Sequence, residues 1–198
     1  MRRKLLLINP ISPDNRGISV NQGQRYPPLG LGMVAALTPD TWDIEILDEV
    51  FDPYDYENNF RDADLVGFTA FTFTVVRAYE IAAVYRQKGI KTVIGGIHAS
   101  MLPEEAKKHV DSVVVGEAEG VWKQVIADFE ADELKSIYTA EYTDLTGQPK
   151  PRHDLFHPGY WFAAIQTTRG CPMNCSFCSV TSFNGNHYRM RPVDEVLD

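Results

Sequence analysis

The sequence predicts an α/β fold with a doubly wound, five-stranded parallel sheet. Short apolar runs end in turn residues, segments with helical periodicity lie between them, and this alternation repeats with short connections. The chain has 198 residues, of which 44% are hydrophobic, and this is enough to bury a full core. We expect the sheet to lie in the part of the chain before about residue 130.

Each expected strand is a short apolar run bounded by turn residues. The first run, KLLLI, stops at Asn9-Pro10 and has the continuous apolar character of a strand that is buried on both faces. The fourth run ends at Gly95-Gly96, which marks a turn in the same way. The five runs cover residues 4–8, 44–47, 65–70, 92–94 and 112–115.

The expected helices alternate with these strands. Pro28 is followed by apolar residues at helical spacing, so a helix is predicted to begin near residue 28. A second helix, over about 75–88, stops at Gly89, a residue typical of helix ends. Two more helices are expected over 104–109 and 121–129. Helices on both faces of a parallel sheet predict the flavodoxin-like strand order 2-1-3-4-5.

The rest of the chain has a different organisation. We expect a sheet domain over 1–130, a linker over 131–160 and a further unit over 161–198. The segments 137–139 and 141–143 form either a small hairpin or an extended linker, 162–167 is predicted to be a buried strand, and 194–197 is predicted to begin a helix. One such β-α unit cannot close a core, so we expect the chain to be a fragment of a longer protein.

Charge and cysteine usage exclude several classes of protein. The net charge of −8 argues against a general binder of nucleic acid or acidic membranes, which needs clustered lysine and arginine. No segment approaches 18 apolar residues, so no membrane span is expected. The three cysteines are too tightly spaced to suggest a disulfide framework, and this favours a reducing, cytoplasmic setting.

The carboxyl ends of the predicted strands carry the candidate ligand contacts. Ligands of open parallel sheets bind at these ends, and glycines there allow close approach of the backbone. The loop PISPDNRG after the first strand is unlike a flavin phosphate loop, and the receiver-type aspartate and lysine are replaced by Thr69 and Glu117. Alternatively, the glycines serve only tight turns. The strand-end residues include Pro10, Thr69, Phe71, Thr72, Gly95, Gly96, His98, Gly116 and Glu117.

All three cysteines lie in the motif Cys171-x3-Cys175-x2-Cys178. Three thiolates can wrap one corner of an iron–sulfur cluster, which usually takes four, and this leaves one iron open. The alternative is a structural zinc site in which His187 is the fourth ligand. The strand expected before the motif and the helix expected after it favour the cluster.

Four motifs in order, PPLGLGMVAAL, GFTAFT, GGIHASMLPEEA and VVVGEAEG, resemble the cobalamin-binding domain that precedes a radical S-adenosylmethionine (SAM) domain. The cysteine motif then resembles the signature of the radical SAM domain itself. The resemblance covers nearly the whole chain and is weakest over 130–160. It implies a cobalamin-binding type of sheet followed by the first β-α unit of a truncated radical SAM barrel.

This resemblance implies a cobalamin contact set at the carboxyl edge of the sheet. No histidine precedes His98, so cobalt is expected to have no histidine of the protein below it, and His98 is expected to contact the nucleotide tail or cap a helix. The alternative for His98 is a purely local hydrogen bond. The implied contacts are Pro10, Leu29, Gly30, Thr69, Phe71, Thr72, Gly95, Gly96, His98, Gly116 and Glu117.

The resemblance also implies a [4Fe-4S] cluster on Cys171, Cys175 and Cys178, with S-adenosyl-L-methionine on the open iron and Phe177 near its adenine. The full-length enzyme would transfer methyl groups or carry out a radical oxidation or cyclisation, with flavodoxin or ferredoxin as electron donor. Its small-molecule substrate would sit in the barrel that this chain lacks, so we assign no catalytic residue and expect the fragment to be inactive. The alternative is a corrinoid carrier or sensor with a structural zinc site.

Overall fold

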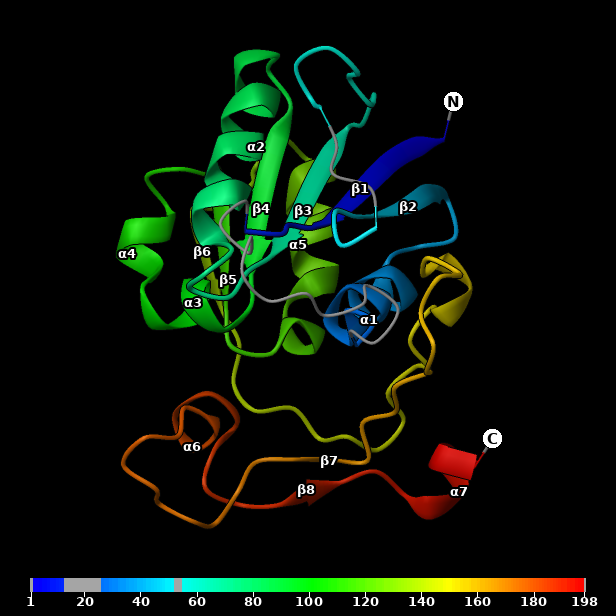
Figure 1. The fold of residues 1–198 in the computed structure, drawn as a ribbon, viewed down its shortest axis with the longest axis vertical. Helices are drawn as coiled ribbons and strands as arrows, with labels where there is room; N and C mark the ends of the chain where they lie inside the picture. Colours follow the sequence, from blue (N-terminus) through cyan, green and yellow to red (C-terminus); the bar gives the residue numbers. More distant parts are fainter. Residues whose placement is uncertain (1, 13–25, 52–54, 198) are drawn as a thin grey trace.

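The computed structural model describes residues 2–12, 26–51 and 55–197, and the loop expected after the first strand lies mostly outside the described residues. A parallel sheet with the strand order β2-β1-β3-β4-β5-β6 forms the centre of the molecule (Figure 1). The order 2-1-3-4-5 is therefore confirmed. Its strands are β1 (Arg3–Asn9), β2 (Trp42–Asp48), β3 (Leu65–Thr69), β4 (Lys91–Gly95), β5 (Ser112–Val115) and β6 (Ile137–Thr139).

The sheet has one strand more than the five that the sequence predicts. β6 pairs in parallel with β5, so that Val113 lies opposite Ile137 and Val115 lies opposite Thr139. Residues 141–143 are in no strand, so the small hairpin considered for this region does not form. Tyr138 fixes β6 in place, because its side chain is buried and its hydroxyl donates a 2.8 Å hydrogen bond to Asp128.

Helices cover both faces of the sheet. α2 (Val75–Gln87), α3 (Ile97–Met101) and α4 (Pro103–Ala106) pack on one face, and α1 (Leu29–Leu37) and α5 (Trp122–Glu130) pack on the other. The helix expected over 104–109 forms only in its first part, as α4, which ends at Ala106. Pro103 has no N–H with which to continue α3, so it begins the separate helix α4 instead.

The alternation of side chains along β1 divides the core into two clusters. Leu6 and Ile8 pack with α2, whereas Leu5 and Leu7 pack with α1 and α5. All four are at most 2% exposed. The continuous apolar run in the sequence is thus explained by a strand that is buried on both faces.

The last part of the chain crosses the carboxyl edge of the sheet as a separate layer (Figure 1). Its two short strands, β7 and β8, pair in antiparallel fashion and flank residues 170–188, here called the cysteine loop. The elements of this layer are β7 (Thr168–Arg169), α6 (Val180–Asn184), β8 (Arg189–Met190) and α7 (Val193–Leu197). In the described part of the chain before this layer, short 3-10 turns occur at η2 (Ala118–Gly120) and η3 (His153–Leu155).

The strand predicted over 162–167 is wrong. Within the described residues no strand pairs with this segment, and its apolar side chains Phe162 and Ile165 are 47% and 66% exposed. The helix expected at 194–197 is confirmed by α7. No helix in the described part of the chain has the length and apolar character needed to cross a membrane.

Candidate functional site

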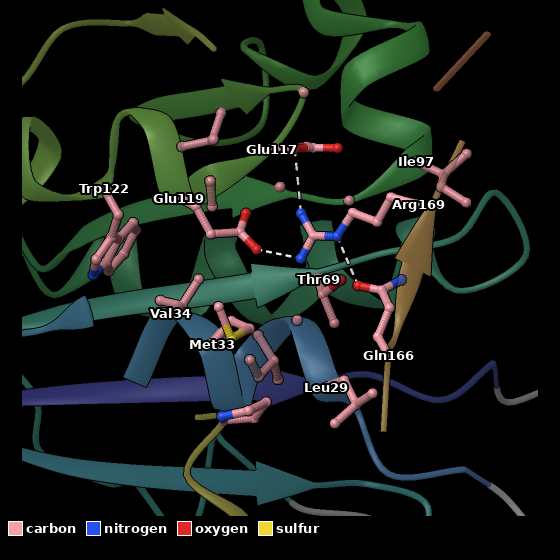
Figure 2. Close-up of a pocket in the computed structure, with 18 of the residues that line it drawn as sticks. Leu29, Met33, Val34, Thr69, Ile97, Glu117, Glu119, Trp122, Gln166 and Arg169 are labelled. Carbon is pink, nitrogen blue, oxygen red and sulfur yellow. Dashed lines mark hydrogen bonds and ion pairs between the residues drawn. The ribbon is translucent and has the colours of Figure 1, made fainter. Parts of the chain in front are cut away.

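A cavity of about 510 Å³ lies between the carboxyl edge of the sheet and the layer that contains the cysteine loop. Small-molecule sites in proteins typically enclose about 300–1,000 Å³. One wall comes from α1, the floor from the ends of β3, β4 and β5, and the cover from residues 164–169 and α6. Most of the lining is apolar, and Figure 2 shows Leu29, Met33 and Val34 of α1 along one side.

Most of the contacts expected from the sequence line this cavity, and they come from α1 and from the ends of three strands. They are Leu29, Gly30, Thr69, Phe71, Gly95, Gly96, Gly116 and Glu117. Pro10, Thr72, His98 and Phe177 lie outside the lining. Pro10 is buried directly after β1, and Phe177 is 91% exposed on the cysteine loop.

The glycines of the cavity fall into two groups. Gly96 and Gly116 have φ angles of +94° and +84°, and a Cβ would lie 2.9 Å from the Thr69 hydroxyl in the first case and 2.8 Å from the Ala140 carbonyl in the second. The backbone conformation and close packing at Gly96 and Gly116 therefore require glycine at both positions. A Cβ at Gly30 would meet nothing within 4 Å, so the fold does not require a glycine there.

His98 makes local hydrogen bonds. Its ring is 6% exposed, with Nδ1 3.1 Å from the Thr72 hydroxyl and Nε2 2.9 Å from Glu105. Tyr79 donates a further hydrogen bond to Glu105. Burial opposes the charge on Glu105, but the hydrogen bonds from His98 and Tyr79 outweigh it and lower the pKa of that carboxyl. Both ring nitrogens of His98 are thus engaged outside the cavity.

Four charged side chains meet where the cavity adjoins the cysteine loop. Figure 2 shows the guanidinium of Arg169 between two carboxylates: it lies 3.3 Å from Glu117 and also pairs with Glu119. Arg189 donates hydrogen bonds of 2.8 Å to Glu117 and to the Thr143 carbonyl. The side chains of the two carboxylates are 2% and 5% exposed, and those of the two arginines 13% and 20%.

Glu117 remains ionised in this cluster. Burial by itself would raise its pKa, but the hydrogen bonds from Arg189 and Thr143, together with the charge of Arg169, lower the pKa to about 2. Thr143 contributes both its backbone N–H, at 3.0 Å, and its hydroxyl, at 2.7 Å. The carboxylate therefore already has a full set of protein partners.

The depressed pKa of Glu117 predicts an acid-sensitive contribution to stability. The ordinary pKa of a glutamate is 4.5, so the contribution is fully present above about pH 4.5 and is lost as the pH falls toward 2. We expect the difference in free energy of unfolding between the parent chain and Glu117→Gln to be constant from pH 7 to 5 and to shrink below pH 4.5. Urea unfolding followed by circular dichroism measures this difference, and one that shrank already near pH 6 would contradict the assignment.

The cysteine loop presents three free thiols. Cys175 is exposed, and Cys171 and Cys178 are partly buried. Two of the backbone hydrogen bonds inside the loop start at cysteines: Cys171 N–H donates to the Gly185 carbonyl, and Cys178 N–H donates to the Cys175 carbonyl. In the described residues no group of three His, Cys, Asp or Glu side chains is close enough to hold a metal ion. The donor set suits a cluster, but the thiols would have to turn toward one another to bind it.

Sequence reasoning missed most of the cover of the cavity. Gln166, Arg169 and Phe183 line it from the layer of the cysteine loop, and Glu119 and Trp122 line it from the segment after β5. One available signal was the pair of acidic residues within VVVGEAEG and the pair of arginines that flank the cysteine motif. These residues are about fifty or more positions apart in the sequence, and local patterns do not show which charges pair.

Comparisons with known proteins find relatives of the chain both in sequence and in fold. Residues 15–126 match the family model described as a B12 binding domain. The chain is 38% identical over 172 residues to the bacteriochlorophyllide d C-8(2)-methyltransferase of Chlorobaculum tepidum, a match that covers 82% of this chain. The chain is also 33% identical to the bacteriochlorophyllide d C-12(1)-methyltransferase of the same organism, and this match covers 100% of the present chain.

A solved structure shares the fold of the entire chain. It is the radical S-adenosylmethionine methyltransferase TsrM from Kitasatospora setae with cobalamin and a [4Fe-4S] cluster bound, with a TM-score of 0.72 and 19% identity over 100% of this chain and 45% of that one. The chain spans 38% and 44% of the lengths of the two Chlorobaculum methyltransferases.

Proposed function

Because this chain belongs to the B12-binding domain family, we propose that the cavity at the carboxyl edge of its sheet binds cobalamin. One observation carries the proposal: most of the predicted contacts line the cavity at the ends of β3, β4 and β5, and these strand ends lie within the range of the family match. A large, mostly apolar space with a few polar groups at its rim is typical of a cofactor site. The glycines bordering it leave room for a flat macrocycle to approach the backbone.

The residues of the chain would act by binding and enclosing the cofactor. Leu29, Met33 and Val34 offer an apolar wall, and Gly30 leaves space at the start of α1. His98 is held by Thr72 and Glu105, which supports binding of cobalamin without a histidine from this position. When bound, cobalamin supplies a cobalt centre that can carry a methyl group, while the apolar enclosure keeps water away from it.

We further propose that Cys171, Cys175 and Cys178 hold a [4Fe-4S] cluster with S-adenosyl-L-methionine beside it. Three free thiols on one loop next to the proposed cobalamin cavity support this proposal. The fold shared with a cobalamin- and cluster-containing methyltransferase supports it as well. Phe177, which is exposed on the same loop, is available to contact the adenine.

The activity of the whole protein is proposed from its relatives. Two of them are named as methyltransferases of bacteriochlorophyllides, so we propose methyl transfer to an organic small molecule. The substrate would bind in a part of the protein beyond this chain, which spans less than half of those relatives. A small electron-transfer protein such as flavodoxin or ferredoxin would reduce the cluster.

Two replacements at Gly30 test the cobalamin site. Gly30 lines the cavity, and a Cβ there would meet nothing within 4 Å, so alanine fits without a clash and a tryptophan side chain starts from open space. We expect Gly30→Trp to place an indole at the cavity wall and raise the dissociation constant of hydroxocobalamin about tenfold or more, equivalent to about 1.4 kcal/mol. Gly30→Ala should change it by no more than about twofold and slightly stabilise the helix.

Absorbance-monitored binding of hydroxocobalamin and thermal unfolding give both readouts. If Gly30→Trp bound hydroxocobalamin as tightly as the parent chain while keeping its thermal stability, cobalamin would not occupy this cavity. A parent chain that binds no cobalamin would contradict the proposed function altogether.

A further inference from the structure

Building on the cobalamin site proposed above, we infer that Glu117 and Glu119 are positioning residues that hold the cysteine loop at the wall of the cavity. Both glutamates follow β5 in the sheet domain, whereas their arginine partners lie at the two ends of the cysteine loop. The contact therefore joins the domain that would bind cobalamin to the segment that carries every thiol of the chain.

The antiparallel pair of β7 and β8, here called the ribbon, closes the cysteine loop and places two arginines side by side. Arg169 of β7 lies directly opposite Arg189 of β8 in the antiparallel register. Like charges at such positions repel each other, and burying a guanidinium without a partner is costly. The side chains of Arg169 and Arg189 are only 13% and 20% exposed, so this ribbon needs two nearby negative charges.

Glu117 and Glu119 supply these two negative charges from the segment that directly follows β5. Glu117 accepts hydrogen bonds from Thr143 on one side and contacts both arginines on the other, and Glu119 pairs with Arg169. Two carboxylates and two guanidiniums neutralise one another. Arg189 also donates a 2.9 Å hydrogen bond to the Asn184 carbonyl within the loop, and Arg191, directly after β8, donates one of 2.7 Å to the Gln148 carbonyl, but neither bond reaches the sheet edge.

Holding the ribbon also fixes the path into the cysteine motif. Gly170, between Arg169 and Cys171, has a φ of +84°, and a Cβ there would lie 2.0 Å from the His187 carbonyl. The backbone at this point is thus tightly packed and transmits the position of Arg169 to the first thiol. Since Arg169, Glu117 and Glu119 also line the cavity, the ionic contacts set where the thiols lie relative to it.

Hydrogen–deuterium exchange of the 198-residue chain without cofactors tests this role. The informative amides are Cys171, bonded to Gly185, and Arg191, bonded to Thr167, which close the loop and its ribbon. We expect Glu117→Gln to raise their exchange rates about tenfold or more, because Arg189 then loses its carboxylate partner and Arg169 keeps only Glu119. The amides of β3 and β4 should keep the rates of the parent chain and serve as an internal reference for folding.

Three further variants make the test specific. Glu119→Gln is expected to raise the same rates and keeps the inference testable if Glu117→Gln fails to fold. Glu117→Asp, which retains the charge, should restore part of the protection. Glu104→Gln, at an exposed carboxylate that pairs with Lys107 on the surface, should leave all rates within about twofold.

A spin label gives a second readout of loop position. In a Cys171→Ser, Cys178→Ser background, Cys175 is the single thiol and can carry a nitroxide. We expect the electron paramagnetic resonance lines to narrow when Glu117→Gln is added, as the loop becomes more mobile. Unchanged exchange and unchanged line shape in both glutamine variants would overturn the inference.

Hydroxocobalamin binding by the same preparations separates the two claims. Faster exchange of the loop amides in Glu117→Gln supports the positioning role, whether or not the parent chain binds cobalamin. A parent chain that binds no cobalamin would contradict only the proposed function. Conversely, a parent chain that binds cobalamin and a loop that does not respond to either glutamate would refute the positioning role alone.

Discussion

Replacing Gly96 by alanine is expected to destabilise the domain by about 3 kcal/mol and to lower the midpoint of thermal unfolding by about 10 °C. Gly96 has a φ of +94° and a ψ of −177°, a combination that is open almost only to glycine. A Cβ would also lie 2.9 Å from the Thr69 hydroxyl and 3.0 Å from the backbone of Ala70. Backbone atoms cannot move aside as a flexible side chain can.

The neighbouring Gly95 offers a matched control. A Cβ there would lie 3.8 Å from Val114, an ordinary van der Waals distance, and its φ is not in the positive range. We expect Gly95→Ala to change the free energy of unfolding by less than about 1 kcal/mol. Urea unfolding of both variants measures the contrast. Equal stabilities for Gly95→Ala and Gly96→Ala would show that the strand-end geometry described for Gly96 is wrong.

Replacing Cys171, Cys175 and Cys178 together by alanine is expected to abolish the uptake of iron and sulfide on anaerobic reconstitution. These are the only thiols of the chain, and a [4Fe-4S] cluster needs thiolate ligands. None of the three lines the cavity, so the affinity for hydroxocobalamin should stay within about twofold of the parent value. Iron and sulfide analysis, with electron paramagnetic resonance of the reduced sample before and after addition of SAM, measures the effect.

His187→Ala distinguishes the cluster from a structural zinc site. His187 is the histidine that a zinc site on this loop would use as its fourth ligand. We expect the variant to take up iron like the parent chain. A parent chain that instead binds one zinc ion, and loses it in His187→Ala, would contradict the cluster and leave a cobalamin-binding domain with a zinc-closed loop.

The sheet could be predicted from the sequence because its signals are local. The apolar run at residues 4–8 indicates a strand covered on both faces, and Gly89 stops α2 where expected, at a φ of +77°. β6 was missed as a member of the sheet because three residues carry too little pattern to separate a strand from a linker. For the segment 162–167 the error is the reverse: a strand is predicted and none forms. An apolar run predicts a strand whether or not a neighbouring strand is present to pair with it.

The candidate site was predictable only in part, for the same reason. The strand ends identify the floor of the cavity, because parallel strands bring their carboxyl ends to one edge. The cover and the charge cluster depend on contacts between distant segments: Arg169 meets Glu119 across fifty positions of sequence. Local patterns also could not reveal that Gly96 is required by its backbone whereas Gly30 is not.

A crystal structure of the chain with hydroxocobalamin, with anomalous scattering recorded at the cobalt absorption edge, would locate the bound cofactor. We expect one cobalt peak within the cavity bounded by Leu29, Gly95 and Glu119, with no histidine nitrogen of the protein at coordination distance. A cobalt peak outside this cavity, or a chain saturated with cobalamin in solution whose cavity stays free of it, would show that cobalamin does not bind at this edge of the sheet.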